Sequence, residues 1–327
     1  MCIRDRRSIF SLVISLFSLS LLAQKITISD LEVDKLTTPI GIDNPNPKFS
    51  WLINSDKYNL KQTHYQIFVA KDKTFSKNSL VWDSGKVKST SSVYVTYDGK
   101  PFDYDTQYFW TVKVWTNKSN LHSQSKISHW KTGLMESENW KSDWITVQSE
   151  DKDSAKSPYF INDFNVNNKI VSANLYITSR GVYEAYVNGQ RVGDSFLTPG
   201  WTSYNNRIQY QAYDVLNMIF KGNNRLGVIL GNGWFKSFRP NNGKRKTDYG
   251  EFTSFISELV ITYADGKKES IINDNDWNYH FGAIQSSSIY NGETVDLTIH
   301  PDQWAQKSYT SKSRFILKSN RNPRRKR

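Results

Sequence analysis

Short runs in which apolar and polar residues alternate dominate this chain, and this two-residue period predicts β-strands. In the first half of the chain the clearest runs are residues 49–53, 65–70, 92–97 and 108–115. Turn residues such as Asp83-Ser84-Gly85 and Asp98-Gly99 separate them. Because such strands recur at regular spacing over about 110 residues, they predict a small β-sandwich.

Two aromatic residues refine this first prediction. Trp51 lies early in the strand series, and Tyr108 opens a later strand. This placement is typical of a fibronectin type III or immunoglobulin-like sandwich with a tyrosine corner, in which the tyrosine hydroxyl bonds back to the chain a few residues upstream. We therefore predict such a domain over residues 25–136.

A second strand series begins near residue 159 and predicts a second all-β domain. Its clearest runs are residues 172–178, 182–187, 226–230 and 254–263. Asn188-Gly189 between two of these runs is a strong hairpin signal. About eight such strands in roughly 150 residues favour a jelly-roll β-sandwich over residues 158–307. Only residues 214–220 suggest a short helix.

The segment between the two domains carries little pattern, and we interpret residues 137–157 as a linker. Trp140 and Trp144 stand near its start. We expect these two indoles to insert between the domains. Both predicted domains are long enough to bury a core of their own.

The N-terminus has the features of a secretory signal peptide. Arg6 and Arg7 precede an apolar run over residues 9–22, which ends at the small residue Ala23. The alternative, a transmembrane anchor, needs about 20 apolar residues, whereas this run is shorter and contains serines. We expect residues 1–23 to be removed, which makes the protein secreted or periplasmic and leaves it without membrane attachment.

The basic charge lies at the two ends of the chain. The formal net charge is +12, but eight basic residues follow Thr310 and the first seven residues add two more, which leaves about +2 for residues 8–310. Nucleic-acid binding needs basic charge on the folded surface, so no nucleic-acid partner is expected. We interpret residues 308–327 as a basic tail produced by truncation.

Metal and cofactor signals are weak. Cys2 is the only cysteine, so no intrachain disulfide can form. The five histidines lack the spacing of a zinc site, and no glycine-rich phosphate loop links a strand to a helix. The run Asn273-Asp274-Asn275-Asp276 offers oxygens for calcium, although such runs also form turns. No cofactor is predicted, and calcium remains a possibility without assigned ligands.

The segment over residues 200–215 is rich in aromatic residues and carries our candidate binding site. Flat rings beside a guanidinium and amides suit a sugar, which presents apolar C–H faces and hydroxyl edges together. The residues proposed for carbohydrate binding are Asn188, Asp194, Trp201, Tyr204, Arg207 and Trp234. A structural alternative stays open, in which Trp201 and Trp234 cap the sandwich core or pack against another domain.

A set of motifs in both predicted domains resembles the leading domains of bacterial α-L-rhamnosidases over about residues 30–305. In the first domain they are Pro39-Ile-Gly-Ile-Asp43, Phe49-Ser-Trp51, residues 81–87 and Tyr108-Phe-Trp110. In the second they are residues 181–184 and 187–194, Pro199-Gly-Trp-Thr202, Tyr204, Arg207, Tyr210, residues 213–215, Gly222-Asn223, Gly231-Asn-Gly-Trp234, residues 263–266, Trp277 and Tyr290-Asn-Gly-Glu293. No one motif decides the matter, but their order spans both domains.

The resemblance implies a secreted enzyme that hydrolyses terminal α-L-rhamnose from glycosides or polysaccharides. Such enzymes invert the anomeric centre with two carboxylates on a downstream (α/α)6 barrel, and inverting carboxyls lie about 6.5–9.5 Å apart. No helical-barrel pattern occurs in this sequence, so no catalytic residue is assigned and the chain alone is expected to be inactive. The acids Glu184, Asp194, Asp214 and Glu293 are expected to be structural.

Within that family the two domains would recognise the rhamnose-containing substrate and support the missing barrel. The main alternative is a free-standing carbohydrate-binding module or adhesin without catalysis. A weaker alternative is a related glycosidase with the same leading domains and a different sugar.

Overall fold

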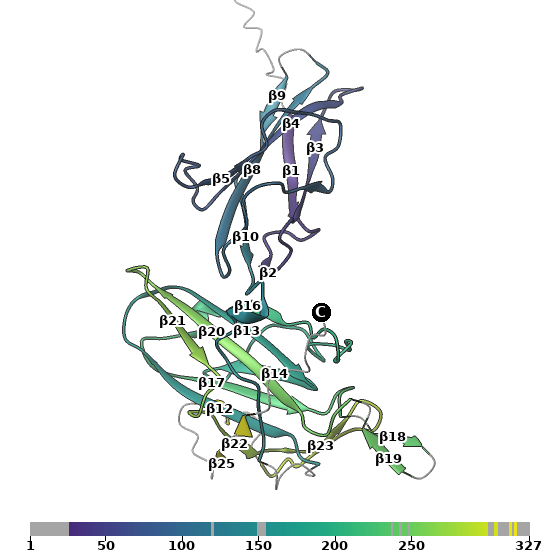
Figure 1. Ribbon diagram of the computed structural model, residues 1–327, viewed down its shortest axis with the longest axis vertical. Helices are drawn as coiled ribbons and strands as arrows, with labels where there is room; N and C mark the ends of the chain where they lie inside the picture. The colour runs from purple at the N-terminus through teal and green to yellow at the C-terminus, as the bar shows by residue number, and fades with distance from the viewer. Residues whose placement is uncertain are drawn as a thin grey trace, which may run out of the picture.

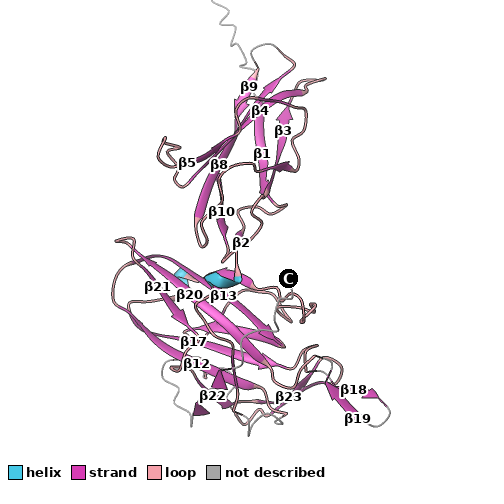
Figure 2. Ribbon diagram, in the orientation of Figure 1, coloured by secondary structure: helices cyan, strands magenta, loops and turns pink. Residues whose placement is uncertain are grey.

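The computed structural model describes residues 26–118, 121–148, 155–236, 238–241, 244–247, 249–299, 304–306, 314–315 and 317–318. Strands dominate this part of the chain, and its only helices are the single-turn 3-10 segments η1 (Ser137–Asn139) and η3 (Leu216–Met218). Figures 1 and 2 show two β-rich domains placed end to end along the long axis. The predicted signal peptide, residues 1–23, lies outside the described residues.

The first domain is a sandwich of two sheets. Its strands are β1 (Ile26–Val33), β2 (Ile40–Ile42), β3 (Lys48–Ser55), β4 (Gln62–Ala70), β5 (Leu80–Asp83), β6 (Val87–Lys88), β7 (Val95–Thr96), β8 (Gln107–Thr116), β9 (His122–Gln124) and β10 (Ser128–Thr132). One sheet has the order β1-β3-β7, and the other has the order β2-β10-β8-β4-β5 with β6 on β4 and β9 on β8. The predicted sandwich is confirmed.

Aromatic rings fill the core of this first domain. Phe49 from β3 meets Trp110 from β8 with ring centroids 4.6 Å apart, and Trp130 from β10 stacks on Tyr108 at 5.4 Å. The Tyr108 hydroxyl accepts a hydrogen bond from the Asp103 backbone N–H at 2.9 Å. This bond back to the preceding turn is the predicted tyrosine corner.

In its described residues, the second domain packs two six-stranded antiparallel sheets face to face. Its strands are β11 (Ile145–Thr146), β12 (Pro158–Val166), β13 (Ile170–Arg180), β14 (Val182–Val187), β15 (Gln190–Arg191), β16 (Gln211–Asp214), β17 (Gly222–Gly231), β18 (Phe238–Asn241), β19 (Lys244–Thr247), β20 (Ser254–Tyr263), β21 (Lys268–Ile272), β22 (Asn278–Phe281), β23 (Ile284–Ser288), β24 (Gly292–Val295), β25 (Arg314–Phe315) and β26 (Leu317–Lys318). One sheet runs β16-β13-β20-β11-β26 with β21 on β20, and the other runs β15-β14-β17-β12-β22-β25. The all-β class predicted from alternation is confirmed here as well.

The core of the second domain lies between these two sheets. Phe160 on β12 and Phe255 on β20 meet at 5.1 Å, and Trp277 packs against Phe255 at the same centroid distance. The predicted hairpin joins β14 to β15, with φ values of 52° at Asn188 and 84° at Gly189. Positive φ at both turn residues is what a two-residue hairpin of this kind requires.

Three segments differ from the sequence prediction. The predicted linker, residues 137–157, contains β11, which pairs with β20 and so belongs to the second domain. The predicted basic tail, residues 308–327, contains β25 on β22 and β26 on β11. The predicted helix at 214–220 is the end of β16 followed by η3. Two-residue strands and single helical turns are too short to show a period, which explains these differences.

Candidate functional site

Trp201 and Trp234 form a parallel pair on the second domain, which we call the aromatic platform. Their ring centroids lie 6.4 Å apart and their planes differ by only 8°. Trp201 is 61% exposed, and its indole N–H donates to the Tyr249 hydroxyl at 3.2 Å. The platform therefore presents an oriented ring surface to solvent.

Buried aromatic residues support the platform from below. Tyr204 is only 4% exposed and packs against Phe235 and Tyr249, with centroid distances of 5.1 and 4.9 Å. Burial raises the pKa of the Tyr204 phenol to about 12. The structure thus places Tyr204 beneath the exposed surface, where it positions the platform through Tyr249.

A tight turn carries Trp234. Gly233 has φ = 51°, and a Cβ on this residue would lie 2.8 Å from Cγ1 of Val182. Glycine meets both constraints because it tolerates positive φ and needs no side-chain space. This turn fixes the ring of Trp234 opposite Trp201.

Among the described contacts, none joins Asn188, Asp194 or Arg207 to the two indoles. The Asn188 amide donates to Met218 O and Asn224 Oδ1 at 2.9 and 2.8 Å, and its oxygen accepts from the Arg225 backbone N–H. It therefore ties the β14–β15 hairpin to its neighbours. Asp194 and Arg207 are exposed. The structure brings together Trp201 and Trp234, with Tyr204 behind them.

The other end of the aromatic segment contacts the first domain. The Tyr210 hydroxyl donates to Asp43 Oδ1 at 2.6 Å and accepts from the Leu134 backbone N–H at 2.9 Å. Asp43 also accepts from the Met135 backbone N–H at 2.8 Å. Burial raises the pKa of Tyr210 above its usual range. A Cβ on Gly133 would overlap both the Tyr210 hydroxyl and the Asp43 carboxylate, so this contact requires glycine there.

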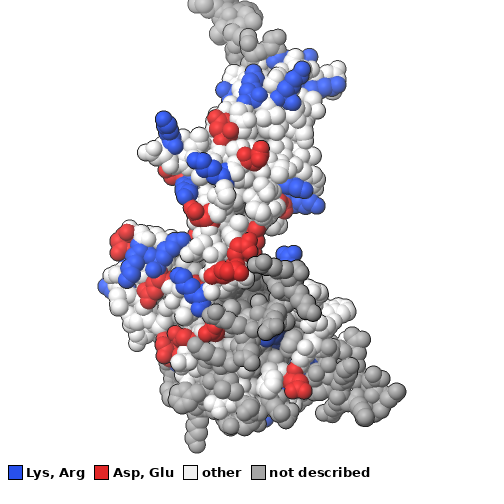
Figure 3. Space-filling model, viewed as in Figure 1, with Lys and Arg blue, Asp and Glu red and all other residues white. Residues whose placement is uncertain are grey.

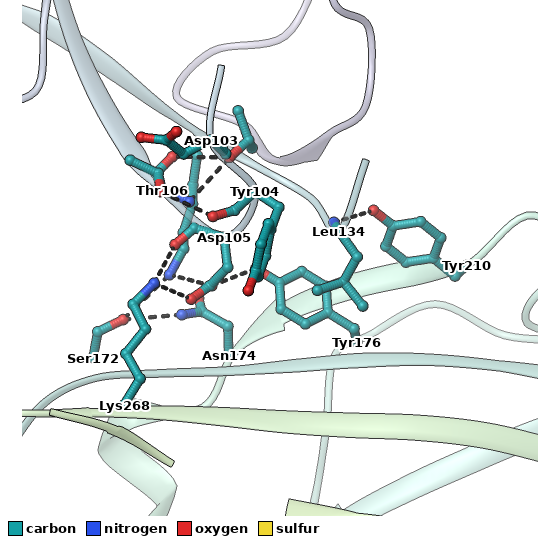
Figure 4. Close-up of polar contacts among 12 residues, drawn as sticks. Asp103, Tyr104, Asp105, Thr106, Leu134, Ser172, Asn174, Tyr176, Tyr210 and Lys268 are labelled. Atoms are coloured by element: carbon teal, nitrogen blue, oxygen red, sulfur yellow. Dashed lines mark hydrogen bonds and ion pairs between the residues drawn. The ribbon is translucent and has the colours of Figure 1, made fainter. Parts of the chain in front are cut away.

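A second polar cluster joins the two domains around Asp105, which is 2% exposed (Figure 4). Its carboxylate accepts from the Tyr176 hydroxyl at 2.7 Å and lies 2.8 Å from the ammonium groups of both Lys131 and Lys268. Burial acts to raise the pKa of Asp105, but the two lysines and the tyrosine outweigh it and the pKa is lowered. The carboxylate therefore remains charged and fully paired.

We call the Asp43 and Asp105 clusters together the junction. Lys131 comes from β10 of the first domain, whereas Tyr176 and Lys268 come from β13 and β21 of the second. Trp140 from the connecting segment packs edge-on against Tyr210, with ring centroids 5.5 Å apart. This indole therefore lies beside a residue of the junction, near the place between the domains where it was expected. Sequence analysis did not identify Asp43 or Asp105 as functional residues, because a single acid in a turn carries no distinguishing pattern.

Comparison with known families assigns both domains. The profile of the Rha78A-like N-terminal immunoglobulin domain matches residues 28–136, and that of the α-L-rhamnosidase N-terminal domain matches residues 168–325. The chain is built from the N-terminal domains of the α-L-rhamnosidase family. The resemblance inferred from sequence motifs is thereby confirmed.

Named relatives and solved structures agree with this assignment. Two α-L-rhamnosidases, from Formosa agariphila and from Alteromonas sp. strain LOR, are 32% and 33% identical over 91% and 83% of this chain. The structure of the α-L-rhamnosidase from Dictyoglumus thermophilum superposes with a TM-score of 0.81 at 34% identity over 90% of this chain. The chain spans 35%, 30% and 34% of the length of these three proteins.

Two of the acidic residues expected to be structural form hydrogen bonds within the rhamnosidase domains. Glu184 accepts from the Tyr186 hydroxyl at 2.6 Å, and Asp214 accepts from the Leu216 backbone N–H at 3.0 Å. Glu293 lies exposed on β24. Asp274 accepts from the Asp276 backbone N–H at 3.0 Å, so the run considered for calcium forms a turn.

In the described part of the rhamnosidase domains, no group of three or more histidine, cysteine, aspartate or glutamate side chains is arranged to hold a metal ion. The same residues contain no helix with the length and apolar character needed to cross a bilayer.

Proposed function

We propose that these domains are the accessory N-terminal part of a secreted, inverting α-L-rhamnosidase that removes terminal α-L-rhamnose from glycosides or polysaccharides. The family assignment and the threefold greater length of its named relatives support this proposal. Hydrolysis would then reside in a downstream helical barrel. The 327-residue chain alone is expected to be inactive.

Within that enzyme, the aromatic platform would recognise the sugar. The parallel stack of Trp201 on Trp234, with Trp201 61% exposed, is the observation that carries this proposal. Rhamnose is a 6-deoxy sugar, so its methyl group and C–H faces can pack on an indole while its hydroxyls reach polar groups at the rim. Binding sites commonly combine an aromatic surface with a few polar groups in this way.

The first domain would act as a structural support. The junction fixes it to the second domain through buried polar contacts at Asp43 and Asp105. A support of this kind holds the platform in a defined orientation for the rest of the enzyme. Ordering before binding reduces the entropy that recognition would otherwise cost.

Tryptophan fluorescence titration tests the platform. Saturable quenching by L-rhamnose is expected in the wild-type chain and should be lost in Trp201→Ala. The matched control is Tyr58→Ala, because Tyr58 is 95% exposed and lies in the turn between β3 and β4. Quenching that persists unchanged in Trp201→Ala would contradict sugar binding at the platform.

A separate assay tests the prediction of inactivity. The purified chain is incubated with a nitrophenyl α-L-rhamnoside and the release of nitrophenol is measured. No release above the uncatalysed rate is expected. Turnover by the purified chain would show that hydrolysis occurs within these two domains.

A further inference from the structure

A cleft of about 690 Å³ opens between the two domains, away from the aromatic platform. Its lining comes from the turn before β8, from the connecting segment around η1, and from β20 and β21. Ligand sites occur preferentially at domain interfaces, in cavities of about 300–1,000 Å³. Figure 3 shows acidic side chains gathered where the two domains meet, beside basic side chains of the second domain.

One wall of the cleft is apolar and partly open to solvent. Tyr104 is 43% exposed, and it lines the cleft together with Phe102 and Met135. In Figure 4 the Tyr104 ring lies beside the Asp105 cluster and extends toward the second domain. Val260 adds an aliphatic contact from β20. This wall offers a ring and aliphatic groups for the apolar part of a ligand.

A buried carboxylate also lines the cleft, from β20. Glu258 on β20 lines the cleft although it is only 1% exposed, and its Oε2 accepts from the Lys141 backbone N–H at 2.9 Å. The Lys141 ammonium donates to Ser270 Oγ at 3.2 Å. A carboxylate held in this way has lone pairs that can accept hydrogen bonds from ligand hydroxyls.

The charged residues around the cleft nearly balance, so the cleft has little net charge to attract a strongly ionic ligand. Its charged lining residues are Asp103, Asp105, Glu136, Glu258, Lys141 and Lys268. Asp105 is already paired with Lys268 and Lys131, and Asp103 pairs with Lys71 at the surface. What remains is a mixture of acceptors and one ammonium group, which suits a neutral polyhydroxy compound better than a phosphate or a polycation.

The junction keeps this cleft open in one shape. Asp105 and Lys268 belong both to the cleft lining and to the buried cluster that joins the domains. The walls are therefore fixed before a ligand arrives, which reduces the entropic cost of binding.

We infer that the interdomain cleft is a second saccharide site, which binds a neutral rhamnosyl unit between Tyr104 and Glu258. The sugar methyl group would pack on the Tyr104 wall, and its hydroxyls would donate to Glu258. The choice of sugar rests on the proposed function, whereas the site itself is independent of the platform.

Calorimetric titration with methyl α-L-rhamnoside separates the two sites in the 327-residue chain. Wild type is expected to bind two equivalents, and Trp201→Ala and Tyr104→Ala are expected to bind one each. The Glu258→Gln substitution keeps the side-chain shape and should weaken the cleft site by about tenfold. Tyr58→Ala serves again as the exposed control, and circular dichroism checks that each variant is folded.

The outcomes distinguish the two proposals. Binding that is abolished by Trp201→Ala and unaffected by Tyr104→Ala and Glu258→Gln would overturn the cleft site and leave the platform intact. Binding that is lost in Tyr104→Ala and kept in Trp201→Ala would support the cleft and refute the platform. Absence of saturable binding in wild type would overturn both, and so would equal weakening by Tyr58→Ala.

Discussion

The two ends of the segment 200–215 use the same kinds of residue for different purposes. At one end, Trp201 stacks on Trp234 and leaves most of its surface in water. At the other, the Tyr210 hydroxyl forms hydrogen bonds with the Asp43 carboxylate and the Leu134 backbone N–H, which both belong to the first domain. Aromatic content alone therefore does not separate a binding surface from a structural contact. The two cases differ in how exposed the ring is and in which residue the hydroxyl or indole N–H of the side chain bonds to.

The largest effect is expected at the junction, from Asp105→Ala. Removing this carboxylate leaves Lys131, whose side chain is 11% exposed, without its buried counterion. Loss of one member of a buried ion pair typically costs about 3–5 kcal/mol. Urea unfolding should show a loss of this size. The control Asp103→Ala breaks an exposed pair with Lys71 and should cost less than about 1 kcal/mol.

Acid should destabilise the second domain through His280. Burial, helped by Arg225, lowers the pKa of His280 from 6.5 to about 4. The unfolded chain therefore binds more protons than the folded one between these values, so stability should fall as the pH falls from about 6.5 to 4, by at most about 3 kcal/mol. Melting temperatures across this pH range would measure the loss.

The matched variants for this pH effect are His280→Phe and His122→Gln. His280→Phe keeps an aromatic ring beside Tyr159 and removes the titrating group, so the melting temperature should depend less on pH. His122 is exposed and lies on β9 of the first domain, so His122→Gln is the control for replacing a histidine elsewhere in the chain. An unaltered pH profile in His280→Phe would exclude this histidine as the cause.

A pair of conservative changes tests the comparison between the two ends of the segment directly. Tyr210→Phe removes a hydroxyl bonded to Asp43 and to Leu134 and should cost about 1–3 kcal/mol, because it leaves buried polar groups unsatisfied. Tyr204→Phe removes only a 3.5 Å contact to Gly200 O, so a smaller loss is expected. Chemical denaturation of both variants measures the difference, and equal losses would contradict the distinction drawn here.

The smallest effect on stability is expected from Trp201→Ala. Its ring is largely in water, so the change in unfolding free energy should stay within about 0.5 kcal/mol, typical of exposed positions. It should nevertheless abolish L-rhamnose binding at the aromatic platform. A large loss of stability in this variant would instead indicate that Trp201 belongs to the packed core.

The sequence was sufficient to predict the longer strands, the two sandwiches, the tyrosine corner and the Asn188-Gly189 hairpin, because each has a local pattern. It did not predict the junction, since Asp105 finds Tyr176 and Lys268 at separations of 71 and 163 residues. The aromatic segment was recognised as important, but its division into Trp201 and Tyr210 ends depends on burial. Residues that are close together in the sequence can differ in burial, because burial here depends on contacts with the other domain.

The short strand β11 has a practical consequence for dissecting this protein. It lies in the stretch that connects the domains, yet it completes a sheet of the second one through its pairing with β20. A cut placed after residue 146 would strip an inner strand from that sheet, and a cut near residue 136 would uncover Tyr176 and Tyr210. Fragments meant to isolate one half should therefore be expected to aggregate, whereas expression from residue 26 onward keeps every described pairing.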